Sequence, residues 1–291
     1  YILLSRAKAY LRYLVSNLIY RYNPIKTNVM SIEETIESIV KSHVCLVRFG
    51  DGEIKFINHK DLLFQKYDRT LAAYLEKILL TDEAGLLVCV PDVFSKLDRY
   101  VDQTKVLWCN HIVSYHKTYR RFCYNRNFGN AFVSRPYIIH KNKMMAKDWF
   151  NSLKGIWHNR DVVIIEGDLT RMGVGNDLFS NAHSIERIIC PSANAFDKFD
   201  DILCEAFKVA KEKMILVSLG PTAKAVVYEL YKQGYQAVDI GHIDSEYEWY
   251  LSGVRKKTLI RGKHTADIKD DVDIGPCSDY EYQKQIRSVV C

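Results

Sequence analysis

The stretch MILVSLGPTAKAVVYELYKQGYQAVDIGHIDSEYEW, residues 214–249, carries the pattern that decides the fold. An apolar run (214–219) leads through a Gly-Pro pair into a helical pattern, and a second apolar run (237–240) follows after Gly234. Short apolar runs are typical of strands that are buried on both faces, and Gly is the usual residue just past a helix C-terminus. The stretch therefore predicts a strand–helix–strand unit, the building block of a parallel sheet.

The same alternation extends over most of the chain. Further strands are predicted at 44–48, 86–90, 162–165 and 185–189, and helices at 31–42, 69–80, 197–213 and 222–233. Ser31 followed by Glu34 is a capping-box pattern that marks the start of the first of these helices. We therefore predict an α/β fold with a Rossmann-like, mostly parallel sheet, helices on both faces, and ligands at the carboxyl ends of the strands.

Composition indicates one large folded domain, because 291 residues with 48% hydrophobic and 26% charged residues can bury a sizeable core. We assign this domain to residues 31–268, between an N-terminal helix (1–30) and an acidic, then polar C-terminal tail (269–291) without a clear element. The net charge of +6 is spread along the chain, which argues against nucleic-acid binding. Lacking an apolar span or signal peptide, the chain is expected in the cytoplasm.

Cysteines and the two less regular regions add three expectations. Cys45, Cys89, Cys190 and Cys204 stand in apolar contexts and are predicted to be buried, reduced thiols. The first 22 residues alternate apolar residues with Arg and Lys, so this helix could pack on the domain or on a second subunit, or lie on the inner face of an anionic membrane. Residues 108–157, rich in Tyr, Arg, Asn and His, are predicted to be a helical insertion that forms an acceptor wall.

Two acidic pairs stand directly after predicted strands. Asp244 and Glu246 follow the 237–240 run, and in an extended segment residues i and i+2 lie on the same side. Two carboxylates facing one way suit a Mg²⁺ or Mn²⁺ ion that also holds substrate phosphates, with His242 as a third ligand. Asp51 and Glu53 repeat the spacing after the 44–48 run. Together the pairs predict one site, although a single such triplet is more often a solvated turn.

Glycine-containing turns after two other predicted strands favour anion binding. Gly220 and Pro221 lead into a helix at Thr222, where free backbone N–H groups could bind phosphate; the alternative is an ordinary strand-to-helix turn. In the 166–179 segment, Gly173 and Gly175 could allow close backbone approach to a ligand. The neighbouring side chains could bind phosphate or sugar hydroxyls, or simply build the loop: Arg171, Asn176 and Asp177.

Arg48 and Asn194 are further polar residues near strand ends. Arg48 stands at the end of a buried strand, and it could pair with Asp51 or with a substrate diphosphate. Asn194 is interpreted first as a helix-capping residue. Gly50, between Arg48 and Asp51, belongs to the same strand-end segment.

These motifs, taken together and in this order, resemble those of the GT-D-type bacterial glycosyltransferases over residues 32–263. The matching segments are RFGDGE (48–53), EGDLTRMGVGNDLF (166–179), RIICPSANAF (187–196), SLGPTAK (218–224) and DIGHIDSEYEW (239–249). The resemblance implies a Rossmann-like fold distinct from the two commoner glycosyltransferase folds, a nucleotide-sugar donor such as UDP-glucose, and a divalent metal, Mn²⁺ or Mg²⁺, held by a D-x-E motif.

On this resemblance we assign roles to named residues. Asp244, Glu246 and His242 are expected to hold the metal, and Asp51 and Glu53 to be catalytic, as donor-sugar ligands with one of them as general base; the two pairs could exchange roles. The residues expected to bind the nucleotide sugar are Arg48, Gly50, Arg171, Gly173, Gly175, Asn176, Asp177, Asn194, Gly220, Pro221 and Thr222.

The function implied is a metal-dependent hexosyltransferase. It would move a hexose, expected to be glucose, from a UDP-sugar to a bacterial surface glycan, glycoprotein or lipid-linked saccharide, with inversion or retention left open. Two alternatives stay beside it: a nucleotide-sugar-binding protein without turnover, and a metal-dependent phosphohydrolase, which the acidic pairs alone would permit. The apolar stripe of the N-terminal helix makes a homodimer plausible.

Overall fold

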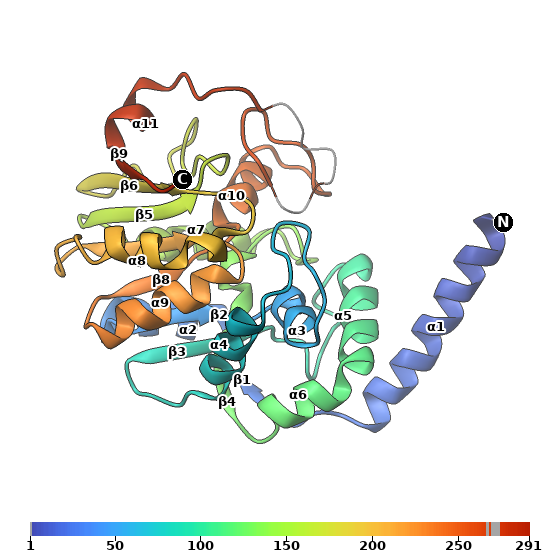
Figure 1. Ribbon diagram of the computed structural model, residues 1–291. Coiled ribbons are helices and arrows are strands. Elements are labelled where there is room, and N and C mark those ends of the chain that lie inside the picture. The colour runs from blue at the N-terminus through green and yellow to red at the C-terminus, as the bar shows by residue number, and fades with distance from the viewer. Residues whose placement is uncertain (1, 266–267, 269–273) are drawn as a thin grey trace.

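A single parallel sheet with helices on both faces forms the body of the protein (Figure 1). The computed structural model describes residues 2–265, 268 and 274–291, with side chains from residue 11 onward. Within these residues the strand order is β1-β4-β3-β2-β8-β7-β5-β6-β9. The strands are β1 (Asn28–Val29), β2 (Cys45–Arg48), β3 (Leu86–Val90), β4 (Asn127–Asn130), β5 (Asp161–Gly167), β6 (Ser184–Cys190), β7 (Met214–Ser218), β8 (Ala237–Asp239) and β9 (Ile286–Val289). The predicted fold class is confirmed.

Helices cover both faces of the sheet. Three of them, α4, α8 and α9, contact one another on one face, and α2 and α7 contact each other on the opposite face (Figure 1). The α-helices are α1 (Ile2–Tyr22), α2 (Ile32–Ser42), α3 (Asp51–Ile57), α4 (Arg69–Leu80), α5 (Asp102–Ser114), α6 (His116–Cys123), α7 (Met145–Lys154), α8 (Phe199–Ala206), α9 (Thr222–Lys232), α10 (Ile243–Leu251) and α11 (Tyr280–Gln285). Short 3₁₀ helices occupy Ala131–Ser134 and Ala195–Lys198.

The predicted strands are all present, and the central ones are buried on both faces as their apolar runs indicated. The capping box between Ser31 and Glu34 is also confirmed. The predicted helix at 197–213 is shorter, because α8 ends at Ala206. The carbonyls of Phe207 and Val209 accept hydrogen bonds from the Tyr235 hydroxyl, so these groups are satisfied outside a helix.

Three strands were not predicted: β1, β4 and β9. β1 lies in the 1–30 segment that was assigned to a helix, and α1 ends at Tyr22. β4 lies within the 108–157 segment, and its sequence NFGN has no apolar run. β9 lies in the C-terminal segment and pairs with β6 at the edge of the sheet, where alternate side chains are exposed. None of the three contains a run of apolar residues, whereas the predicted strands β2 and β8, which are equally short, lie in such runs.

Most of the cysteine prediction is confirmed. Cys45, Cys89 and Cys190 are buried, and they are free thiols. Cys204 is exposed on α8, so its predicted burial was wrong. An apolar neighbourhood in the sequence does not fix which face of a helix a residue occupies.

The N-terminal helix α1 packs against α5 along one side (Figure 1). Tyr13 and Tyr20 pack against the core, and the Tyr20 hydroxyl donates to the Val93 carbonyl (2.6 Å). The opposite side of the helix is apolar but exposed, at Leu11, Leu14, Val15, Leu18, Ile19 and Tyr22. Among the described residues, no helix has the length and apolarity needed to cross a membrane.

Candidate active site

A cavity of about 390 Å³ lies at the carboxyl ends of the strands. Residues that follow each strand from β2 to β8 line it, so the central part of the sheet contributes its whole edge to the wall. Loops diverge and helices begin at this edge, which is where open parallel sheets bind ligands. The edge that the sequence indicated is therefore the one that carries this cavity.

The predicted site residues divide into two groups. Those that line the cavity are Arg48, Gly50, Asp51, Glu53, Gly220, His242 and Asp244. Those that lie outside its lining are Arg171, Gly173, Gly175, Asn176, Asp177, Asn194, Pro221, Thr222 and Glu246. The contacts of the second group explain what they do instead.

The acidic pair Asp51 and Glu53 occupies the first turn of α3, directly after β2. Glu53 accepts the Gly50 N–H (2.7 Å) and lies 2.7 Å from Lys224 Nζ, so its charge is already engaged at the helix start. Asp51 pairs with Lys55 (2.6 Å), and its side chain is 37% exposed. Burial raises the pKa of Asp51, but the hydrogen bond and charge of Lys55 outweigh burial and lower it. Asp51 is therefore an ionised carboxylate with access to the cavity.

Arg48 pairs with Asp239 rather than with Asp51. Its Nη2 lies 2.6 Å from Asp239 Oδ1, and its Nε donates to the Asp239 carbonyl (2.8 Å). Lys224 Nζ lies 3.1 Å from Asp239 Oδ2. Burial raises the pKa of Asp239, but Arg48 and Lys224 together lower it. A Cβ at Gly241 (φ +43°) would lie 1.8 Å from Arg48 Nη2, so only glycine at this position leaves room for the Arg48 guanidinium.

Sequence reasoning missed two members of this network, Asp239 and Lys224, although each left a signal. Asp239 ends an apolar strand pattern, and Lys224 stands among the apolar residues 223–227 of a helix. Both side chains are almost fully buried (1% and 4% exposed). A charged residue in a segment that must be buried needs an opposite charge beside it. The pattern predicted burial but could not identify the partner.

The segment that contains Asp244 and Glu246 is helical, not extended, so the expectation that both carboxylates face one way is wrong. Two residues along an α-helix are rotated by about 200°. Glu246 is fully buried, and its Oε2 accepts the N–H groups of Tyr137 (3.0 Å) and Ile138 (2.8 Å). Glu246 therefore holds the backbone of the 131–140 segment, while Asp244 lies on the cavity side.

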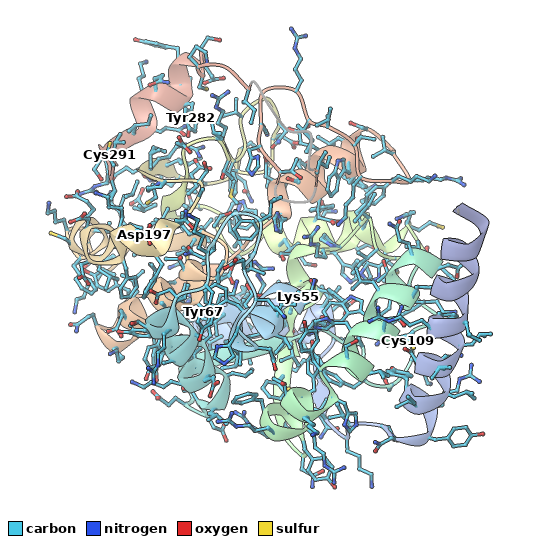
Figure 2. The ribbon with its side chains drawn as sticks, turned by 45° about the vertical axis from the view of Figure 1, so that its right-hand side comes forward. Lys55, Tyr67, Cys109, Asp197, Tyr282 and Cys291 are labelled. Carbon is cyan, nitrogen blue, oxygen red and sulfur yellow. The ribbon has the colours of Figure 1, made fainter. Side chains whose placement is uncertain are left out.

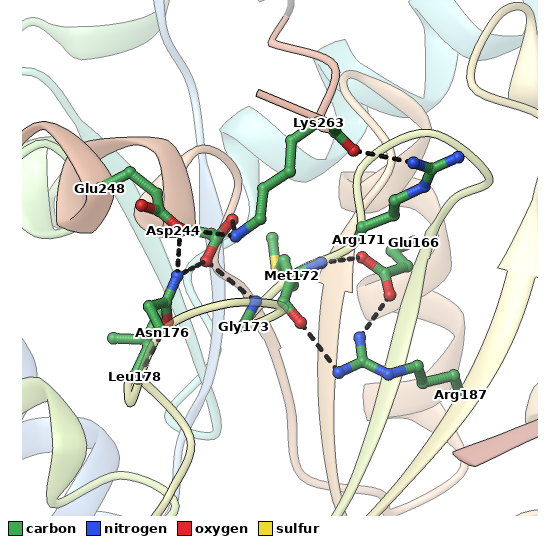
Figure 3. Close-up of polar contacts among 11 residues, drawn as sticks. Glu166, Arg171, Met172, Gly173, Asn176, Leu178, Arg187, Asp244, Glu248 and Lys263 are labelled. Carbon is green, nitrogen blue, oxygen red and sulfur yellow. Dashed lines mark hydrogen bonds and ion pairs between the residues drawn. The ribbon is translucent and has the colours of Figure 1, made fainter. Parts of the chain in front are cut away.

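Asp244 binds the loop that follows β5 (Figure 3). Its Oδ1 accepts the Gly173 N–H (2.9 Å) and the Asn176 amide (2.8 Å), and its Oδ2 accepts Lys263 Nζ (2.8 Å). Glu248, one turn further along α10, accepts from the same lysine and the same amide. This cluster ties the 168–178 loop and the segment around Lys263 to α10.

The remaining predicted residues of this loop point to other parts of the protein. Arg171 is buried, and its guanidinium donates to the carbonyls of Gly262 and Gly275. Asp177 pairs with Lys154 (2.8 Å) on α7. Gly175 (φ +78°) has a backbone conformation that L side chains rarely adopt. These placements agree with the interpretation of 166–179 as a structural loop, and ligand contacts by its side chains stay a prediction.

Asn194 fixes another part of the cavity wall from outside. Its N–H donates to the Phe64 carbonyl (2.8 Å), and its side-chain oxygen accepts the Lys66 N–H (2.8 Å). Phe64 lines the cavity beside Gly220, where a Cβ would lie 2.3 Å from the phenylalanine ring. The Asn194 side chain makes no capping hydrogen bond, contrary to the prediction. The two hydrogen bonds of Asn194 instead join the 62–66 wall to the loop that follows β6.

The predicted strand-to-helix turn before α9 is confirmed. Pro221 precedes the first helical residue, and the buried Thr222 hydroxyl lies 3.4 Å from Gln65 Oε1 in the 62–66 wall. Lys224, in the first turn, donates to the Gly220 carbonyl (3.0 Å). The helix start thus packs against the wall, and phosphate binding there stays a prediction.

The 108–157 segment supplies the opposite wall with Trp108, Phe132 and Arg135. His111, one turn after Trp108, is packed among aromatic rings. Burial lowers the pKa of His111 to about 4, although neighbouring Asp51 opposes this shift. The imidazole is therefore neutral at physiological pH. The segment forms part of the cavity as predicted, and its role toward an acceptor stays a prediction.

The three predicted metal ligands do not converge. Glu246 lies outside the cavity lining, and among the described residues no group of three or more His, Cys, Asp or Glu side chains is placed to hold a metal ion. Asp244 and His242 do share the cavity wall. Mg²⁺ usually binds one or two carboxylates together with substrate phosphates and water, so this pair fits a divalent ion only with a bound diphosphate.

Sequence comparison relates the chain to glycosyltransferases. The family model described as "Glycosyltransferase GT-D fold" matches residues 46–268. "Glycosyltransferase GlyD" of Streptococcus pneumoniae is 43% identical over 259 residues, which are 89% of this chain and 32% of that protein. "Probable glycosyl transferase Gly" of Streptococcus gordonii is 40% identical over 260 residues, 89% of this chain and 38% of that protein. The chain thus spans about a third of the length of each of these relatives.

Solved structures agree over nearly the whole chain. A domain reported as the "highly conserved domain of unknown function 1792" with "a distinct glycosyltransferase fold" superposes with a TM-score of 0.90 at 44% identity, covering 95% of this chain and 99% of that one. "A New Glycosyltransferase" from Streptococcus sanguinis gives a TM-score of 0.89 at 40% identity, covering 91% and 100%. The likeness includes every strand of the sheet that borders the cavity.

Proposed function

Because this chain belongs to the family with the GT-D glycosyltransferase fold, we propose that it transfers a hexose, with glucose as the first candidate, from a UDP-sugar to a saccharide acceptor. The acceptor would be part of a bacterial surface glycan or glycoprotein, or a lipid-linked saccharide. One observation carries the proposal: an ionised carboxylate, Asp51, has access to a strand-end cavity of about 390 Å³. A cavity of this size suits a small ligand.

Asp51 is the proposed general base. It would take the proton from the acceptor hydroxyl as that oxygen bonds to the anomeric carbon, while the bond from this carbon to the diphosphate breaks and its electron pair leaves with UDP. Glu53 is less suited, because Gly50 and Lys224 already engage both of its oxygens. A base on the acceptor side corresponds to inversion, so the anomeric configuration of the product, read by NMR, tests this step.

Cations around the cavity would stabilise the charge that develops on the leaving diphosphate. Arg135 and Lys55 line the wall near Asp51. Arg48 and Lys224 line the cavity as well, and they are paired with Asp239 and Glu53. A divalent ion, Mn²⁺ or Mg²⁺, would add Lewis-acid stabilisation of the same charge, held by His242 and Asp244 with the diphosphate. It would take the place of the Lys263 ammonium, which lies 2.8 Å from Asp244 Oδ2.

Calorimetric titration of UDP, with Mn²⁺ and again with a chelator, tests the donor site. We expect binding that weakens at least tenfold with the chelator, and release of UDP from UDP-glucose when an acceptor is present. Unchanged binding with the chelator would remove the metal from the proposal. Failure to bind UDP in both conditions would exclude a uridine diphosphate donor, and release of inorganic phosphate from a simple ester would favour a phosphohydrolase.

We further propose that α1 lies on an anionic membrane surface next to this catalytic domain. Its inner side packs on α5, whereas Leu11, Val15 and Leu18 form an exposed apolar stripe with Arg12 on one flank and Arg21 on the other. Helix α1 carries no acidic residue, so an anionic lipid surface complements its positive charge better than a second copy of the same helix would. Co-sedimentation with phosphatidylglycerol vesicles, lost in Leu11→Glu/Leu18→Glu, tests this; a dimer in light scattering without vesicle binding would contradict it.

A further inference from the structure

Both backbone polar groups of Met172 are held by a buried ion pair (Figure 3). The Met172 N–H donates to Glu166 Oε2 (2.8 Å), and its carbonyl accepts from Arg187 Nη2 (2.8 Å). Glu166 and Arg187 pair with each other and are 0% and 3% exposed. Met172 lines the active-site cavity, whereas its two holders lie outside that lining. The ion pair therefore fixes one residue of the wall from behind.

The next residue in the loop connects this pair to α10. Gly173 N–H donates to Asp244 Oδ1 (2.9 Å), so two successive backbone N–H groups are each accepted by a buried carboxylate. Gly173 has φ +76°, and a Cβ there would lie 2.7 Å from the Phe179 ring. A shift of Met172 would move Gly173, and with it the hydrogen bond to Asp244.

The short helix α11 completes the contacts of Arg187. Arg187 Nε donates to Gln285 Oε1 (2.8 Å), and its guanidinium lies over the Tyr282 ring, 4.6 Å from the ring centre. Each nitrogen of the guanidinium thus has its own partner: the Glu166 carboxylate, the Met172 carbonyl or the Gln285 amide oxygen. Because the guanidinium is rigid and planar, contacts that orient its Nε also fix the directions in which Nη1 and Nη2 point. Figure 2 shows Tyr282 at the edge of the molecule that α11 occupies.

A second cavity, about 500 Å³ in volume, separates α11 from the loop. Gly173 and Asn176 line one side of it, Tyr282 and Gln285 line the other, and Arg187 also borders it. Side-chain packing between the loop and α11 is interrupted by this space. Among the described residues, Arg187 contacts both α11 and Met172.

We propose that α11 is a positioning element of the active site, acting through Arg187. Gln285 and Tyr282 orient the guanidinium, and Arg187 with Glu166 sets the position of Met172 and Gly173 in the wall next to Asp244. The helix lies beyond residues 46–268, the part of the chain that the family model matches. The inference rests on the proposed function in one respect only: the identity of the ligand that the site binds, a UDP-sugar.

The chain offers a matched pair of variants on α11. Gln285→Ala removes the acceptor of Arg187 Nε, whereas Gln283→Ala, two residues away, removes an amide that donates to the Cys277 carbonyl. Gln285→Glu keeps an acceptor oxygen in place. Hydrogen–deuterium exchange of the Met172 and Gly173 amides should be about tenfold faster in Gln285→Ala, and unchanged in the other two variants.

The same variants separate positioning from a general loss of stability. With UDP-glucose as the probe, we expect Gln285→Ala to raise the donor KM several-fold and to change kcat less, and Gln285→Glu to restore the KM. Equal exchange at Met172 in Gln285→Ala and Gln283→Ala would overturn the proposal, as would faster exchange spread over all strands. If the wild type does not bind UDP, the proposed function fails, and the exchange comparison still decides the role of α11.

Discussion

The two acidic triplets, 51–53 and 244–246, have the same spacing and the same place after a strand, but their carboxylates have different surroundings. In α3 both Asp51 and Glu53 line the cavity, and the side chain that pairs with Asp51 in the described part of the chain is an exposed lysine. Of the two carboxylates in the second triplet only Asp244 lines the cavity, and Glu246 is buried against two backbone N–H groups. The first triplet has the properties of a reactive site, and the second has those of a scaffold that also borders it.

The difference shows that the spacing of two acids predicts a site only when the local backbone is known. Both triplets begin a helix, so the second carboxylate of each turns away from the first. Glu53 turns toward a helix start and a buried lysine, and Glu246 turns toward a neighbouring loop. Whether a carboxylate reacts or supports the fold therefore depends on segments far away in the sequence.

The largest effect is expected for Asp51→Asn. Loss of the general base should lower the transfer rate by about 10²- to 10⁴-fold, measured as product formed from UDP-glucose and an acceptor. Stability should change little, because the Asp51 side chain is 37% exposed and pairs only with an exposed lysine. Full transfer activity in this variant would show that α3 is not the reactive helix.

Glu246→Ala should show the opposite behaviour. Removing this carboxylate leaves the N–H groups of Tyr137 and Ile138 buried without an acceptor, at a cost of about 1–3 kcal/mol each in the free energy of unfolding. Urea unfolding measures this loss, with Asp51→Asn as the matched control. Wild-type stability in Glu246→Ala, combined with lost metal-dependent UDP binding, would instead return Glu246 to the metal site.

Acid should destabilise the fold through His111, which lies on α5. Burial lowers the pKa of His111 to about 4, below the ordinary value of 6.5 that it regains on unfolding. Above pH 6.5 both states are neutral and the residue contributes nothing. Between pH 6.5 and 4 the unfolded state binds the extra proton, so the free energy of unfolding falls by up to about 1.4 kcal/mol per pH unit.

His111→Phe should reduce this slope, because phenylalanine keeps the aromatic packing with Trp108 and Tyr119 and cannot be protonated. Urea unfolding at pH 7, 6 and 5 compares the variant with the wild type. Burial lowers the pKa of His140 as well, to about 3, but His140 is present in both proteins and so contributes equally to both slopes. Equal slopes in variant and wild type would rule out His111 as a source of the acid sensitivity.

The smallest effect is expected for Lys55→Met. This lysine is 41% exposed, and exposed ion pairs contribute about 0–1 kcal/mol to stability. Removing the charge should let the pKa of Asp51 rise, so the acid limb of the pH–rate profile should move to higher pH while the maximum rate stays within a few-fold. An unmoved acid limb would indicate that Asp51 does not act as the base.

Sequence patterns were sufficient for the central sheet and for the edge that carries the site. The runs at 162–165 and 214–219 are long, apolar and bounded by turns, so they could be recognised without a partner. β1, β4 and β9 could not, because they lack apolar runs and depend on pairing with neighbouring strands at the two sides of the sheet. The same limit applied to Asp239 and Lys224, whose burial was visible in the sequence but whose pairing was not.

The sequence by itself thus determined the alternation of strands and helices, the parallel sheet, and the edge at which polar residues gather, because these depend on periodicity along the chain. Only the tertiary structure decided which polar and charged groups contact one another. Arg48 and Asp239 are 191 residues apart, Gly173 and Asp244 are 71 apart, and Arg187 and Gln285 are 98 apart. Contacts of this kind leave no spacing pattern, since they depend on how separate elements pack.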